Sequence, residues 1–180
     1  EALLEHLKAL GHRTFRFISG DANNRNTALR NAAFLSFMKN HRLPSSASDI
    51  VTGAYSIEHG YASALKLHQE RPGFSAVVCG DDMIAFGAMA GLKSCGLRIP
   101  EDVAVAGFMD DPLAVVADPG LTTIHHPMVH MGRRAFEFFL SLLNEPQQTA
   151  PREILNTQLI IRRSTDVTRP IYANVGSFAP

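Results

Sequence analysis

Residues 76–111, AVVCGDDMIAFGAMAGLKSCGLRIPEDVAVAGFMDD, decide the fold of this chain. The apolar run Ala76–Cys79 is too short for a buried helix and is closed by a glycine, so it predicts a fully buried strand. A helix is expected over about 83–95, and a second buried strand over 103–108. Strand, helix and strand in this order form a β-α-β unit, which predicts a parallel sheet with right-handed crossovers.

Aspartates follow both strands of this unit. Asp81 and Asp82 come directly after the first strand, where their side chains could cap the helix. Asp110 and Asp111 follow the second strand, after Met109. Because ligands of parallel sheets bind beyond the carboxyl ends of the strands, both groups are expected at one functional edge.

Two glycines, Gly87 and Gly91, lie inside the expected helix. Each weakens a helix by roughly 1 kcal/mol relative to alanine. We expect them to allow a close approach of the helix backbone to the sheet. A third glycine, Gly96, stands where a glycine commonly ends a helix.

The segments before residue 76 continue the alternation. Apolar spacing and turn residues predict helices over 1–10, 27–41 and 56–69, with strands over 14–19 and 50–52. The expected fold class is therefore α/β, a parallel β-sheet flanked by helices on both faces. The side chains of the second helix expected to face the core are Leu29, Ala33, Phe37 and Met38.

The pattern changes after Asp111. Residues 112–120 are expected to be irregular, and 121–124 to form a short strand or linker. Pro127 suits the first turn of a helix that carries a strong apolar stripe as far as Leu143. A strand is predicted within 151–164, and the tail from residue 165 onward shows little pattern.

Composition narrows the class of protein. The chain has 180 residues with a formal net charge of +0, which suits one domain and argues against a nucleic-acid-binding surface in this stretch. Its two cysteines, Cys79 and Cys95, occupy apolar positions and are expected to be reduced, as in a cytoplasmic protein. No apolar run approaches the roughly 20 residues of a membrane span, and no signal peptide is visible.

Several stretches resemble the effector-binding core of the LacI/GalR family of bacterial transcription regulators. They are HLKALGHRTFRFISG (6–20), AYSIEHGYASAL (54–65), the stretch 76–111 and PGLTTIHHP (119–127). The resemblance covers about residues 1–165 and implies a periplasmic-binding-protein-like (type I) fold. It also implies a small-molecule effector held between two subdomains, a homodimer, and operator DNA bound through a helix-turn-helix that this chain lacks.

The resemblance divides the chain into parts of an incomplete effector-binding domain. Residues 1–120 correspond mainly to the second subdomain, and 121–150 to a crossover segment and helix of the first. Residues 151–165 correspond to a return strand, and 166–180 to a C-terminal tail. Most of the first subdomain is expected to lie outside this sequence, which starts without Met at Glu1.

The resemblance also implies ligand-binding residues. Arg30 matches a position where relatives place an arginine against the ligand, and Tyr55 matches an aromatic that stacks on a sugar or base. The alternatives are a solvated arginine and a tyrosine packed on the sheet. Asn24 and Asn26 lie in the loop that makes polar ligand contacts, although they could instead cap the loop, or a register slip could give that role to Arg25 and Thr27.

The other implied ligand residues follow the two strands of the central unit. Asp81 holds the position of a ligand-binding Asn or Asp, whereas Asp82 is expected to cap the helix. Met109 stands where relatives that bind neutral sugars commonly have Asp, and a thioether is a poor acceptor. Asp110 could substitute for that Asp only if the loop is rotated. The effector is therefore expected to be a sugar or sugar derivative, with an acidic derivative as one alternative.

Two other readings are disfavoured. His125, His126 and His130 lack a Cys or carboxylate at ligand spacing, so no metal and no cofactor is expected. No motif of a hydrolase, phosphate-binding loop, zinc protease or dinucleotide site is present, so no enzyme is expected. The alternative function is a periplasmic solute-binding protein of a sugar transporter, for which a signal peptide upstream would be the distinguishing feature.

Overall fold

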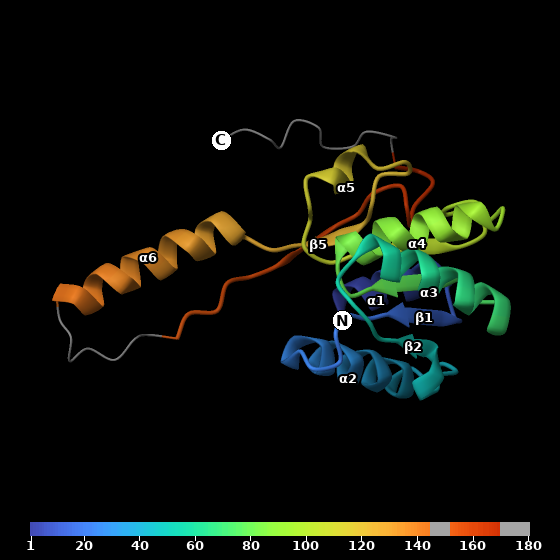
Figure 1. Cartoon of the computed structure of the whole chain (residues 1–180), viewed down its shortest axis with the longest axis horizontal. Coiled ribbons are helices and arrows are strands. Elements are labelled where there is room, and N and C mark those ends of the chain that lie inside the picture. The colour runs from blue at the N-terminus through green and yellow to red at the C-terminus, as the bar shows by residue number, and fades with distance from the viewer. Residues whose placement is uncertain (145–151, 170–180) are drawn as a thin grey trace.

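The computed structural model describes residues 1–144 and 152–169. Its centre is a sheet of parallel strands in the order β2-β1-β3-β4. The strands are β1 (Phe15–Ile18), β2 (Ile50–Val51), β3 (Ala76–Cys79) and β4 (Ala104–Ala106). The parallel α/β sheet predicted from the sequence is confirmed (Figure 1).

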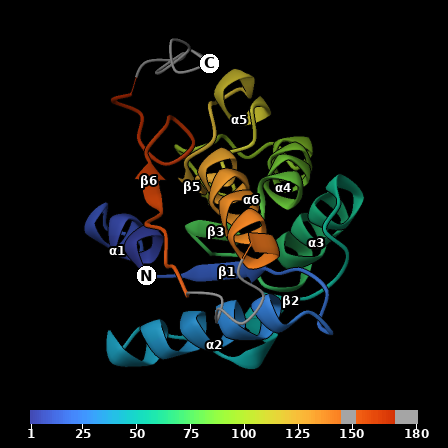
Figure 2. The ribbon, with the colours of Figure 1, turned by 90° about the vertical axis from the view of Figure 1, so that its left-hand side faces the viewer.

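Helices cover both faces of this sheet, as predicted. They are α1 (Ala2–Ala9), α2 (Arg25–Asn40), α3 (Ile57–Glu70) and α4 (Asp82–Ser94). Figure 2 shows α1 and α2 on one side of the sheet and α3 and α4 on the other. Strand residues alternate between the two cores, so that Val78 packs with α1 and α2 while Val77 packs with α3 and α4.

The buried face of α2 differs from the prediction. Leu29 is 58% exposed and Ala33 is also exposed, whereas Thr27 and Phe34 are buried. Phe37 and Met38 are buried as expected. The predicted stripe was therefore out of register, since the buried face runs through Thr27, Phe34, Phe37 and Met38.

The helical glycines approach a helix and not the sheet. A Cβ atom at Gly87 would lie 2.0 Å from the carbonyl oxygen of Ile57, and one at Gly91 would lie 2.8 Å from that of Tyr61. The backbones of α3 and α4 are therefore in direct contact. The prediction of a close approach is confirmed, but the partner it named is wrong.

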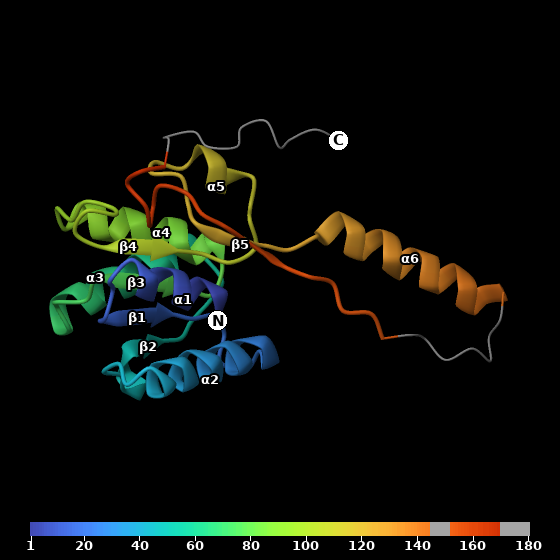
Figure 3. The same ribbon diagram turned by 180° about the vertical axis from the view of Figure 1, so that it is seen from behind.

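Beyond β4 the chain leaves the sheet and returns. A short helix, α5 (Leu113–Val116), interrupts the segment expected to be irregular. Strand β5 (Thr123–His125) pairs antiparallel with β6 (Gln158–Ile160), and isolated parallel bridges place this segment beside the exit of β4. The segment before β6 runs back toward β5 from the side of α6 (Figure 3).

Helix α6 (Met128–Asn144) projects away from the sheet and has no buried residue (Figure 1). It forms where the apolar stripe predicts it. The expected segments 121–150, 151–165 and 166–180 each lie partly outside the described residues. None of the helices in the described part of the chain has both the length and the apolar character of a membrane span.

Candidate functional site

The carboxyl ends of the four sheet strands meet at one edge. Ser19 and Gly20 follow β1, the turn carrying Tyr55 follows β2, Asp81 follows β3, and Met109 follows β4. Because the strands are parallel, segments far apart in sequence come together here. The strand exits therefore meet as predicted, and the candidate side chains differ in how they are held.

Arg30 reaches across this edge from α2. Its Nη1 donates to the carbonyl oxygen of Gly80 at 3.0 Å, and its guanidinium carbon lies 4.2 Å from the centre of the Phe108 ring. It is half-buried, unlike a freely solvated arginine. A guanidinium carries five N–H donors, so donors remain for a ligand after the bond to Gly80.

Tyr55 is fixed from two sides. Its hydroxyl lies 2.7 Å from Oγ1 of the buried Thr27. Its ring lies so close to Gly20 that a Cβ atom there would be 2.0 Å from the ring carbon Cζ. The hydroxyl is thus engaged within the protein, and the ring is the part of Tyr55 that could contact a ligand.

Asp81 and Asp82 have different partners. Asp81 caps α4, accepting from the backbone N–H of Ile84 at 2.8 Å, whereas Asp82 accepts from Thr123 Oγ1 at 2.6 Å and from the N–H of Asp111 at 2.7 Å. The prediction that Asp82 is the cap is wrong, because Asp82 is turned toward β5. Burial raises the pKa of both carboxyls.

Asn24 and Asn26 belong to the start of α2. The side chain of Asn24 accepts from the N–H of Asn26 at 2.8 Å and so caps the helix. Both residues are exposed, so capping and contact with a ligand are compatible. The capping alternative considered for Asn24 is present in the structure.

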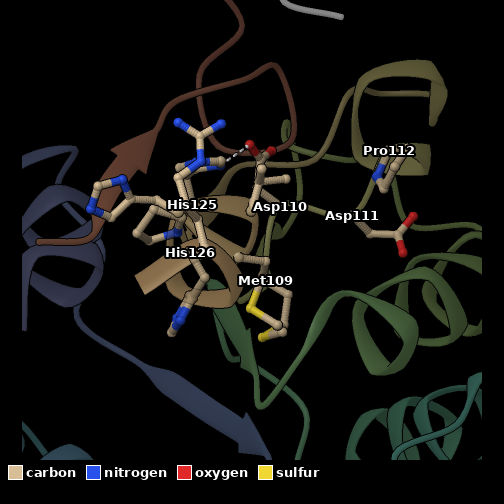
Figure 4. Close-up of a pocket in the computed structure, with 11 residues that line it drawn as sticks. Met109, Asp110, Asp111, Pro112, His125 and His126 are labelled. Atoms are coloured by element: carbon tan, nitrogen blue, oxygen red, sulfur yellow. Dashed lines mark hydrogen bonds and ion pairs between the residues drawn. The ribbon is translucent and has the colours of Figure 1, made fainter. Parts of the chain in front are cut away.

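Met109 and Asp110 form a left-handed turn after β4, with φ of 133° and 59°. The carboxylate of Asp110 is shared, with one oxygen 2.8 Å from Arg162 Nη2 and the other 2.9 Å from His125 Nδ1. Figure 4 shows Asp110 and His125 pointing toward one another, with Met109 below them.

The turn lines a hollow of about 680 Å³ between the exit of β4 and the start of α6. Basic groups in its wall are His125, His126, His130 and Arg133, and acidic groups are Asp110 and Asp111. Because Asp110 is already paired with Arg162 and bonded to His125, the wall offers more N–H donors than free acceptors to a ligand. Arg30 and Tyr55 do not line this hollow, so the predicted residues share an edge but not one cavity.

Phe108 and Arg162 were not singled out from the sequence, and His126 was considered there only as a metal ligand. Phe108 lies under the Arg30 guanidinium, and its ring centre is 4.7 Å from that of His126. The pKa of His126 is lowered, mainly by burial of the ring and further by the nearby Arg30 and His125. The one available signal for Arg162, which is 4% exposed, was its position directly after the apolar run Leu159–Ile161.

No group of three or more His, Cys, Asp or Glu side chains that could hold a metal ion is found within residues 1–144 and 152–169. The histidines at 125, 126 and 130 do not converge on a common point with carboxylates. His125 contacts Asp110, and the ring of His126 packs against that of Phe108.

Comparison with known proteins identifies the fold. The family described as "Periplasmic binding protein-like domain" matches residues 4–165. Among solved structures, a LacI-family regulatory protein from Chloroflexus aggregans superposes with a TM-score of 0.83 at 28% identity, covering 91% of this chain and 59% of that one. The lac repressor dimer bound to operator and an anti-inducer superposes with a TM-score of 0.81 at 26% identity, covering 90% and 56%.

The curated relatives are transcriptional repressors, not enzymes. The repressor PurR of Haemophilus influenzae is 31% identical over 89% of this chain and 48% of its own length. The probable repressor ExuR of Bacillus subtilis is 29% identical over the same shares. The chain spans about half the length of these relatives. It belongs to the periplasmic binding protein-like domain family, in the branch formed by the effector-binding cores of LacI-type transcription regulators.

Proposed function

We propose that this chain is the part of a cytoplasmic transcription regulator that senses a small-molecule effector at the carboxyl edge of its sheet. The observation that carries the proposal is that Tyr55, Asp81 and Met109 follow three different strands at that edge, and that Arg30 reaches the exit of β3 through Gly80. An arginine fork, an aromatic ring and a few polar groups are the usual chemistry of a small-molecule site.

The expected ligand is a sugar derivative that carries a negative charge. Arg30 retains free donors beside the edge, and a guanidinium binds carboxylate or phosphate in a forked geometry. Met109 offers no useful acceptor, and both oxygens of Asp110 are already engaged by Arg162 and His125. A solved relative described as a sugar-binding LacI-family regulator from Escherichia coli is complexed with phosphate, which supports this class.

The proposed regulation works through the angle between two subdomains. An effector with different affinity for two arrangements of the domain shifts their populations, and the dimer then presents its DNA-binding segments differently. Operator binding and the homodimer are proposed by analogy with the lac repressor dimer bound to operator. The competing proposal, a solute-binding protein of a transporter, has less support because the curated relatives named above are repressors.

Calorimetry on the full-length protein tests the ligand class, with glucuronate, glucose 6-phosphate and glucose as matched ligands. Hydrogen bonds to charged groups contribute about 1.5–3 kcal/mol, so Arg30→Ala should weaken an anionic ligand by roughly 10- to 150-fold. Tyr55→Ala should weaken it by removing the stacking face. Met109→Asp should weaken an anion by repulsion and favour glucose.

Arg13→Ala is the matched control, because Arg13 precedes β1 at the opposite end of the sheet and its guanidinium bonds carbonyl oxygens of its own neighbourhood. It removes the same charge and should leave binding unchanged. Tight binding of glucose that is insensitive to Arg30→Ala would contradict both the ligand class and the role given to Arg30.

A further inference from the structure

We infer that Arg162 is a positioning residue that sets the ligand specificity of the β4 exit, by fixing the Met109–Asp110 turn and neutralising Asp110. Arg162 lies in the return segment after β6 and contacts no part of the proposed ligand edge except through that turn. The inference rests on the proposed function, because specificity has meaning only if the edge binds an effector.

Arg162 joins two segments of the crossover region. It is 4% exposed, its Nη1 donates to the carbonyl oxygen of Leu121 at 2.8 Å, and its Nη2 donates to Asp110 Oδ1 at 2.8 Å. Its own backbone N–H donates to Thr122 Oγ1 at 2.8 Å. The planar guanidinium can satisfy the carbonyl and the carboxylate at once, which a flexible lysine cannot do with the same geometry.

The turn that Arg162 holds is strained. Met109 and Asp110 both have positive φ, and left-handed conformations of such residues persist where the surroundings fix them. Backbone bonds contribute, since the N–H of Met109 donates to the carbonyl oxygen of Ile124 at 3.0 Å. At the side-chain level, Asp110 is held by Arg162 on one oxygen and by His125 on the other.

This arrangement decides what the wall of the 680 Å³ hollow offers to a ligand. With Asp110 engaged by two basic groups, the wall presents the thioether of Met109 and a carboxylate whose charge is balanced. Without Arg162, the carboxylate would be free to accept from ligand hydroxyls and to repel an anion. Arg162 therefore favours anionic ligands over neutral polyols at a site that it does not touch.

Methyl NMR on the full-length protein with labelled methionines tests the positioning step without any ligand. In Arg162→Gln, the Met109 methyl resonance, assigned by its loss in Met109→Leu, should move and sharpen as the turn relaxes. The buried Met38 and Met89 report whether the core remains intact and should not move. Arg163→Gln is the matched control at the adjacent position and should leave Met109 unchanged.

Asp110→Asn tests the same contact from the other side and serves if Arg162→Gln fails to fold. It should give the same displacement of the Met109 signal, and the double variant should add nothing further, because both changes break one pair. Arg162→Lys keeps the charge and should restore the signal in part. An unmoved Met109 signal in the folded variants would overturn the inference.

The binding arm uses glucuronate and glucose as probes. Arg162→Gln should lower the ratio of glucuronate affinity to glucose affinity by about 10-fold. The reason is that the unpaired carboxylate of Asp110 would repel glucuronate and accept from the hydroxyls of glucose. Equal loss of both affinities would show a merely structural role and contradict the inference. If the parent protein binds neither probe while the methyl signals behave as expected, the proposed ligand class fails and the positioning role of Arg162 stands.

Discussion

Two neighbouring carboxylates show how much one position along a helix matters. Asp81 stands at the N-cap of α4 and is half-buried, whereas Asp82 is 1% exposed and holds both β5 and the turn after β4. Asp82 thus connects α4, through Thr123 and Asp111, to the segment that leaves the sheet. A side chain with this role stabilises the crossover and does not need to contact a ligand.

Replacing Asp82 should therefore cost more stability than replacing Asp81. Asp82→Ala leaves the Thr123 hydroxyl and the Asp111 N–H without their acceptor, and a buried unsatisfied group costs about 1–3 kcal/mol, so we expect a loss of about 2–4 kcal/mol. Asp81→Ala loses an N-cap, worth about 1 kcal/mol. Urea unfolding of the two variants measures both values, and equal losses would contradict this division.

The raised pKa of Asp82 also predicts a pH dependence. Burial raises this pKa above its ordinary value of 3.8, so the folded state binds the proton more tightly than the unfolded state. The difference in unfolding free energy between the parent and Asp82→Asn should therefore fall as pH rises from 3.8 to the folded pKa, and then stay constant. Urea titrations between about pH 3.5 and 7 measure it.

Asp102 provides a control of opposite sign. Its hydrogen bonds to Arg98 lower its pKa to about 2. Its stabilising contribution is therefore present above pH 3.8 and is lost as the pH falls from 3.8 to about 2. The difference between the parent and Asp102→Asn should be flat over the window in which the Asp82 difference changes. A rising Asp82 difference over that window would contradict burial as the cause of its shift.

At the scale of elements, local patterns predicted the helices and strands well but not their partners. The Gly96 stop and the short apolar strands are local signals, and each is present in the structure. Which surface a helix faces depends on contacts between distant segments. For this reason the sequence indicated that the backbone at Gly87 must approach something closely, but could not show that this is α3.

Gly87→Ala should test the contact between α3 and α4. The new methyl group would meet the Ile57 carbonyl oxygen at 2.0 Å, and overpacking of this kind costs about 1–3 kcal/mol despite the better helix propensity of alanine. Gly132→Ala in α6 is the matched control, since a Cβ there meets no atom within 4 Å and should stabilise the helix by about 1 kcal/mol. Thermal unfolding and helical circular dichroism distinguish the two, and equal effects would contradict the close contact.

At the scale of the whole molecule, the position of the site was predictable and its supporting contacts were not. A parallel sheet has one edge where strand exits meet, so Arg30, Tyr55, Asp81 and Met109 could be placed near one another from their sequence positions. The bond between Asp110 and Arg162 joins positions 52 residues apart, and no local pattern encodes such a pair. Family resemblance suggested candidate ligand residues, and the structure was needed to find the side chains that hold them.

Helix α6 has no buried residue, and the apolar stripe predicted along it is exposed. Exposed side chains of this stripe include Met128 at 53%, Phe139 at 56% and Leu143 at 61%. A helix of this length without tertiary packing is marginal in water, and a large apolar patch favours association. We expect amide exchange in α6 of this 180-residue chain to be much faster than in the buried α4, and to slow as protein concentration rises and copies associate through the stripe.

Sedimentation velocity over a wide concentration range, combined with hydrogen exchange, measures both effects on this chain. Phe139→Glu together with Leu143→Glu should abolish the association and leave α6 exchanging fast at every concentration. Leu29→Glu is the matched control, because Leu29 is a comparably exposed leucine on α2, outside the stripe, and should leave association unchanged. A monomer at all concentrations whose α6 amides nevertheless exchange as slowly as those of α4 would contradict the prediction, since the helix would then be stable without any partner for its apolar face.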